Sequence, residues 1–222
     1  MSDFKAIGGT VRARAAGELR DRILTGRLRP GSRVDLDEIT EEFGTSRTPV
    51  REALLELSYE GLVTVTPRSG ITVVGITPED AIDNFAVLAA LSGKAAQWAT
   101  ERISRPELDA LHDLAGAVGE ADDVVAANWN FHRALNRASG SPRLLTFLRQ
   151  AVRVVPASYF ELFPEQVHRS RSDHARVLEA IDRGDAASAR TLTESHVLDA
   201  GDALGNWLRT RAQESPLGSP GA

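Results

Sequence analysis

The stretch SRTPVREALLELSYEGLVTVTPRSGITVV, residues 46–74, decides the fold because its hydrophobic pattern changes from helical to strand-like spacing. Its first half predicts a helix that ends at Gly61. Ser46 is a candidate N-cap, and Pro49 lies in the first turn, where proline is tolerated. The second half is rich in β-branched residues, as strands are. The stretch therefore predicts one helix followed by a pair of short strands.

The predicted hairpin follows three predicted helices. Residues 62–66 and 71–74 form its strands, and the Pro-Arg-Ser-Gly sequence at 67–70 is typical of the turn between them. Upstream, residues 11–25 and 35–43 have apolar side chains at helical spacing, and each run stops at a glycine. Helices joined by a tight turn and followed by a small hairpin describe a winged helix-turn-helix.

The rest of the chain is predicted to be helical. Thr77 is the N-cap of the first of six segments with short connections, so an all-α antiparallel bundle is the expected architecture and the fold class is mainly α. Pro156 lies inside one segment and should kink or split it. We expect a winged helix-turn-helix domain at 1–75, an all-helical domain at 76–213 and a disordered tail, rich in Pro, Gly and Ser, at 214–222.

Composition excludes several kinds of site. The 222 residues include no cysteine, which excludes disulfides, thiolate metal sites and a cysteine nucleophile. No apolar run approaches the ~20 residues that span a bilayer, so no membrane partner is expected. The first residues lack the apolar core of a signal peptide, which predicts a cytoplasmic protein.

The net charge of −5 argues at first against nucleic acid as a partner, but the charge is unevenly distributed. Residues 1–75 hold 11 basic and 11 acidic side chains, so the whole acidic excess lies in residues 76–222. Residues 1–34 carry eight basic side chains against three acidic ones. Screening limits the reach of a charge to ~8 Å at physiological salt, so an acidic protein can present a basic surface. Scattered, solvated charge is the alternative interpretation.

The start of the third predicted helix carries side chains suited to duplex recognition. Arg47 and Arg51 are four residues apart and share a helical face, from which arginine can contact guanine or phosphate. Thr45, Ser46 and Thr48 suit phosphate contacts near a helix N-terminus. An arginine at the predicted hairpin tip is a further candidate. An ordinary helical surface with two arginines is the alternative interpretation.

Three of the five histidines have a spacing that suits a metal site. His174 lies ten residues before the turn at Gly184, and His196 lies twelve residues after it. These separations correspond to roughly 15 and 18 Å of helix, so in an antiparallel hairpin the two imidazoles stand at nearly the same level. His132 and Asn128, on one face of another helix, would complete a set of three imidazoles and one oxygen donor. Unrelated histidines are the alternative, which spacing alone leaves open.

Over about residues 11–75 the chain resembles the DNA-binding domain of GntR-type bacterial transcription regulators. The most specific pieces are SRTPVREAL (46–54), LSYEGLV (57–63) and the turn PRSG (67–70). The resemblance implies DNA contacts from the third helix and from the wing turn, by Arg47, Thr48, Arg51, Arg68 and Gly70.

The first two predicted helices also bear on this expectation. Arg20, in the first helix, is a weaker candidate for a phosphate contact. Some members of the family have an arginine in the second helix, where this chain has Asp37, Glu38 and Glu41. We therefore assign no DNA contact to that helix.

From about residue 79 to residue 213 the chain resembles the FCD ligand-binding domain of FadR-like regulators. The matching strings are NWNFHRALNRASGSPRL (128–144), SDHARVLEAIDRGDAASAR (172–190) and ESHV (194–197). The resemblance implies a helical bundle that binds an effector, and many members hold a metal with one Asp and three His. The corresponding positions here are His132, His174, His196 and, where the Asp usually stands, Asn128.

This chain departs from that pattern in ways that affect the ligands. Asn128 offers an amide oxygen without negative charge, and the set suits Zn²⁺, Ni²⁺, Mn²⁺ or Fe²⁺. Members often carry a carboxylate-binding arginine in the bundle's first helix, but here that stretch runs from Leu88 to Ser92 without one. A carboxylate effector would then depend on the metal or on Arg149 and Arg153, which share a predicted helical face. A solvent-facing role for these two arginines is the alternative.

Together the patterns predict a metabolite-responsive transcription regulator, a repressor in the commoner case. It would bind a pseudopalindromic operator as a homodimer and a small organic acid at a divalent metal. A metal-free bundle that serves dimerisation only is one alternative. A metal-dependent helical hydrolase fused to a DNA-binding module is another, disfavoured because the chain shows no positioned general base beyond acids such as Asp173 and Glu194. We therefore expect a protein that is not an enzyme.

Overall fold

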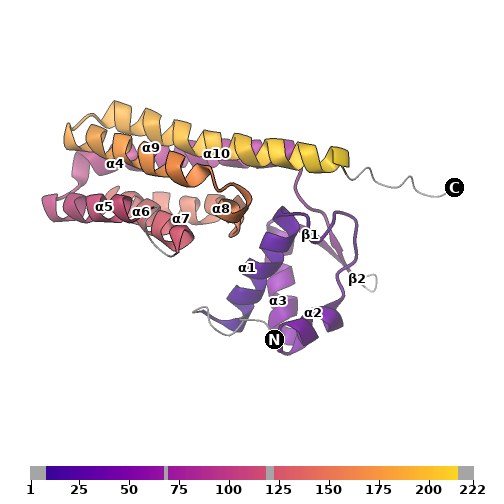
Figure 1. Cartoon of the computed structure of the whole chain (residues 1–222). Coiled ribbons are helices and arrows are strands. Elements are labelled where there is room, and N and C mark those ends of the chain that lie inside the picture. Colours follow the sequence, from indigo (N-terminus) through magenta and orange to yellow (C-terminus); the bar gives the residue numbers. More distant parts are fainter. Residues whose placement is uncertain (1–8, 68–69, 119–122, 215–222) are drawn as a thin grey trace. The chain divides into compact units, whose positions relative to one another are not determined.

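The computed structural model describes residues 9–67, 70–118 and 123–214 (Figure 1). The chain divides into two compact units, Met1–Ile76 and Thr77–Ala222. None of the helices in the described ranges is long and apolar enough to cross a membrane. The expected tail falls almost wholly outside the described residues, and its first residue, Glu214, closes the last helix instead.

The first unit consists of three helices and a hairpin, as the sequence predicts. The helices are α1 (Val11–Leu24), α2 (Leu36–Glu42) and α3 (Arg47–Tyr59). Strands β1 (Val63–Thr66) and β2 (Gly70–Val73) pair antiparallel, with Val63 opposite Val73. The winged helix-turn-helix is confirmed.

Local capping and a small apolar core hold this unit together. The Asp35 side chain accepts hydrogen bonds from the backbone N–H groups of Asp37 and Glu38 at the start of α2. Ser46 occupies the N-cap position of α3 as predicted, but its side chain makes no capping hydrogen bond. Leu19 of α1 and Leu54 of α3 are fully buried at the centre of the core.

The second unit is an all-helical bundle. Its helices are α4 (Pro78–Arg102), α5 (Arg105–Ala117), α6 (Val124–Ala138), α7 (Pro142–Ala151), α8 (Tyr159–Leu162), α9 (Gln166–Asp182) and α10 (Ala186–Glu214). Thr77 and Asp80 form the capping box that starts α4. The segment around Pro156 is split as predicted: a 3-10 turn, η2 (Val152–Val154), follows α7, and α8 begins beyond the proline.

The two longest helices, α4 and α10, pack along each other through glycines. A Cβ at Gly201 would overlap the Cβ of Phe85, and one at Gly205 would lie 2.8 Å from Cγ1 of Ile82. Such distances are far below a normal carbon–carbon contact of ~3.5–4.0 Å. The spacing between α4 and α10 therefore depends on residues without side chains.

We expect Gly201→Ala to destabilise the chain by about 1–3 kcal/mol, because the added methyl has no room. The matched control is Gly116→Ala, since nothing lies within 4 Å of a Cβ at that exposed helical glycine. There the alanine should stabilise by about 0.4–1 kcal/mol through higher helix propensity and a less flexible unfolded chain. Urea denaturation of both variants measures the two changes, and equal effects would contradict the packing argument.

Candidate metal centre and DNA-reading helix

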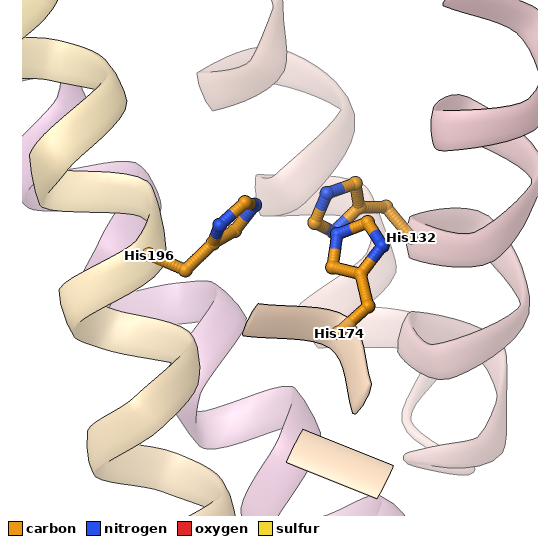
Figure 2. A group of neighbouring side chains, drawn as sticks. All are labelled: His132, His174 and His196. Atoms are coloured by element: carbon orange, nitrogen blue, oxygen red, sulfur yellow. The ribbon is translucent and has the colours of Figure 1, made fainter. Parts of the chain in front are cut away.

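Three imidazoles from three helices meet inside the bundle. His132 of α6, His174 of α9 and His196 of α10 point toward one another, and their candidate ligand nitrogens all lie within 4.8 Å (Figure 2). The ring centroid of His174 lies 4.9 Å from that of His132 and 5.0 Å from that of His196. Within the described ranges this is the one cluster of three or more His, Asp or Glu side chains with metal-ligand spacing. The structure therefore brings together the three histidines selected from the sequence.

Packing and one hydrogen bond orient these rings. His174 is buried and stacks on the ring of Phe131, with centroids 3.9 Å apart. His196 Nδ1 lies 3.2 Å from an oxygen of Asp173, one residue before His174 on α9. An ionised carboxylate can only accept, so His196 donates from Nδ1 and its Nε2 is the nitrogen left for another partner. The hydrogen bond from His196 holds the pKa of Asp173 below its usual range.

Asn128 lies one helical turn before His132 on α6 and is buried. Its Oδ1, like both ring nitrogens of His174, has no hydrogen-bond partner within the described residues. Buried polar atoms without partners are rare in native proteins, and a bound ion is a recognised reason for them. These atoms belong to the predicted donor set, so the donors fit a divalent metal of the Zn²⁺, Ni²⁺, Mn²⁺ or Fe²⁺ type.

The surroundings keep two of the imidazoles, those of His132 and His174, neutral. Desolvation inside the bundle, together with the charge of His196, lowers the pKa of His132 to about 3. Desolvation is also the largest cause that lowers the pKa of His174 well below its usual value. Neutral imidazole is the form that ligates metals, so the bundle prepares both rings for that role near pH 7.

A cavity of about 650 Å³ adjoins the histidines. Polar lining comes from α6 and α10, including Asn128, His132 and His196. Most of the remaining lining is apolar and comes from α4 and from the segment between α7 and α8. A volume of this size lies within the ~300–1,000 Å³ typical of small-molecule sites.

The two arginines proposed for an effector carboxylate separate in the structure. Arg149 lines the cavity and is exposed, and it also donates to Thr146. Arg153 is not among the described residues that line the cavity. The predicted shared helical face does not form, because α7 ends at Ala151 ahead of Pro156 and Arg153 falls in η2.

Sequence reasoning missed two other arginines. Arg133 and Arg137 on α6 also line the cavity. The helical period contained the signal, since Trp129, Arg133 and Arg137 repeat every four residues beside the row that holds His132.

The predicted DNA-reading side chains lie at the exposed start of α3. Arg47, Thr48 and Arg51 are exposed, as is Ser46, while Thr45 is half-buried. Arg47 donates to a carboxylate oxygen of Asp37 on α2 at 2.6 Å. The acidic second helix thus holds one of the predicted reading arginines.

The remaining predicted DNA contacts are Arg68, Gly70 and Arg20. Arg68 lies outside the described residues, and Gly70 starts β2 with a φ of +93°, which favours glycine. Arg20 donates to both oxygens of Glu60 at 2.7 Å, and its side chain is only 14% exposed. This ion pair joins α1 to the end of α3, so we assign Arg20 a structural role in place of the predicted phosphate contact.

Comparison with known proteins gives the class and then the family. Residues 11–73 match the family described as bacterial regulatory proteins, gntR family, and residues 83–199 match the FCD domain. A helix-turn-helix transcriptional regulator from an unstable DNA locus of Streptomyces ambofaciens is 30% identical, over 81% of this chain and 79% of its own length. The protein is therefore a DNA-binding transcription regulator. It belongs to the GntR family and carries a FadR-like FCD domain.

Two more distant comparisons agree with this placement. A probable D-xylose utilization operon transcriptional repressor of Paenarthrobacter nicotinovorans is 27% identical, over 84% of this chain and 87% of its own. The structure of Escherichia coli McbR/YncC superposes with a TM-score of 0.66 at 21% identity, covering 94% of this chain and all of that one. The latter supports the fold alone. These relatives are regulators rather than enzymes, in line with the expectation that the chain is not an enzyme.

The metal-free chain is expected to lose stability as the pH falls from about 6.5 toward 4. The folded state lowers the pKa values of His132 and His174, so between the folded and unfolded values the unfolded chain binds more protons. Chelator-treated protein should therefore show a decreasing Tm across this window. His132→Gln should reduce the slope, whereas His168→Gln, at an exposed position, should keep it. An unchanged slope in His132→Gln would contradict the buried, neutral state of that ring.

Proposed function

We propose that this protein is a metabolite-responsive repressor that binds a pseudopalindromic operator as a homodimer through its winged helix, residues 1–75. A divalent metal and a small organic acid bind in the helical domain, residues 76–213. The observation that carries the proposal is that the three-histidine cluster opens onto the cavity. His132 and His196 belong to the cluster and also line the cavity. The named repressor of Paenarthrobacter nicotinovorans supports the sign of regulation.

His132, His174 and His196 would hold the metal, with the Asn128 amide oxygen as the fourth donor. When bound, a divalent metal supplies positions that accept a carboxylate oxygen. The chain's own contribution is orientation: Phe131 fixes the ring of His174 by stacking, and Asp173 fixes the tautomer of His196. All four donors are neutral, so the effector's carboxylate would bring the negative charge that the donor set lacks.

Protein purified without a metal-affinity tag is expected to contain stoichiometric metal, measured by elemental analysis. His196→Ala should lose it because the cluster loses one ligand, and Asn128→Asp should bind it more tightly because a charged oxygen replaces a neutral one. The control is His168→Ala, an exposed histidine on α9 outside the cluster, which should keep its metal.

Loading each variant with Zn²⁺, Ni²⁺, Mn²⁺ and Fe²⁺ in turn distinguishes the proposal from its competitor. Absence of bound metal under every condition would favour a metal-free bundle that serves dimerisation only. Equal metal content in the wild type and in His196→Ala would place the metal elsewhere.

For the operator, the exposed start of α3 supports the proposal. Arg47 and Arg51 project from the same helical face, and Ser46 and Thr48 lie beside them near the helix N-terminus. Without DNA, the exposed Arg47 guanidinium is paired with Asp37 of α2. A homodimer would present two such helices to half-sites about one DNA turn apart or a multiple of it.

Arg51→Ala is expected to weaken binding to a duplex enriched from a random-sequence pool by about 1–3 kcal/mol if Arg51 reads a base. If it contacts phosphate instead, the slope of log K against log salt should fall by about 0.9. Fluorescence anisotropy over a salt series measures both quantities. Arg105→Ala, which removes an exposed arginine of the bundle, is the control and should change neither. Wild-type binding by Arg51→Ala would remove α3 from the proposed interface.

A further inference from the structure

The wall that α4 gives to the cavity is without charge. It consists of Phe85, Leu88 and Ser92, and each of these side chains is buried. A carboxylate placed against this wall would meet no cation. Because burying an unpaired charge costs much free energy, a ligand whose carboxylate lay against this wall would bind weakly.

The wall between α7 and α8 is also apolar. Leu148 is 5% exposed, and Val152 and Val155 continue the lining beyond the end of α7. Tyr159 adds an aromatic ring, and its hydroxyl donates to the backbone carbonyl of Ala200 at 3.3 Å. Because that hydroxyl is already bonded, the tyrosine presents mainly apolar surface to a ligand.

The metal-ligand donors and the cations lie in other parts of the lining. The interior donors are Asn128, His132 and His196, on α6 and α10, and the buried hydroxyls of Ser92 and Ser170 are the uncharged polar groups beside them. The cationic ones are Arg133, Arg137 and Arg149, and all three are exposed. Exposed cations raise the local concentration of an approaching anion, but they are not inside the apolar part of the cavity.

We propose that the effector is a monocarboxylate with an extended apolar body, aliphatic or aromatic, rather than a small hydroxy acid or a polycarboxylate. Its carboxylate lies at the histidine cluster and its body lies against Leu88, Leu148 and Val155. The inference rests on the proposed function, because it concerns the same site. The cavity volume of about 650 Å³ exceeds what an acid of a few carbons fills, and neither of the two walls offers a cation to pair with a second carboxylate.

The test is calorimetric titration of the full-length, Zn²⁺-loaded protein with straight-chain acids from acetate to decanoate. Each added methylene should tighten binding about three- to fourfold, the increment for burying a CH₂, until the cavity is filled. Octanedioate is the matched probe, since it has the length of octanoate and a second carboxylate. We expect it to bind at least tenfold more weakly than octanoate. A flat series, or tighter binding of octanedioate or citrate than of octanoate, would overturn the inference.

Two variants test whether the apolar body of the acid lies against the α4 wall and the wall between α7 and α8. Leu88→Asn and the less buried Val155→Asn should each reduce the gain per methylene, whereas Leu192→Asn should not. Leu192 is a suitable control because it is half-buried in the α9–α10 region and does not line this cavity. Thermal unfolding of each variant confirms that it folds, and an undiminished gain per methylene in both wall variants would overturn the placement of the body.

The outcomes separate this inference from the proposed function. If metal binds and citrate raises the Tm while octanoate does not, the inference fails and the metal-centred effector site stands. If octanoate binds with the expected chain-length dependence but the protein binds no metal, the inference about the apolar body holds and the proposed metal site is overturned. If neither metal nor any carboxylate binds, both are overturned.

Discussion

The close approach of α4 and α10 is the constraint on which the sensor domain depends. Gly201 and Gly205 bring the two helices together, and α10 also carries His196 and Val197, which line the cavity. Gly93 does the same near Glu194, whose side chain lies over the position a Cβ would take. If these helices were farther apart, the uncharged wall that α4 gives to the cavity would move away from His196 and Val197 on α10.

Neutrality is the second organising feature of the bundle. The domain carries the chain's whole acidic excess, yet its candidate metal centre offers three imidazoles and an amide and no carboxylate. Asp173, whose carboxylate accepts from His196 and orients its ring, is flanked by Arg169 and Arg176, with closest approaches of 3.9 and 3.7 Å. A metal held this way would keep more of its positive charge for an anionic effector than one with a ligating carboxylate. The departure of Asn128 from the usual Asp is thus consistent with a sensor that needs its ligand's charge.

Sequence patterns were most reliable where the determinant is local. Periodicity, glycine stops and the Thr77 cap predicted the helices and the hairpin, and Pro156 predicted the break after α7. They failed for some individual side chains, because of a distant partner in one case and an early helix end in another. Arg20 binds Glu60 forty residues away, and Arg153 leaves the predicted helical face because the helix ends early. Ser46 holds the N-cap position without making the expected bond.

The sequence by itself determined the two-domain plan, the family and the three histidines, because helix period, turn residues and ligand spacing are properties of neighbouring residues. Only the tertiary structure decided what surrounds those histidines. The hydrogen bond from His196 to Asp173, the isolation of the Asn128 oxygen and the apolar character of the cavity all arise from helices that meet in space. The burial of a side chain and its hydrogen-bond partners depend on segments that are distant in sequence, and a local sequence pattern does not contain that information.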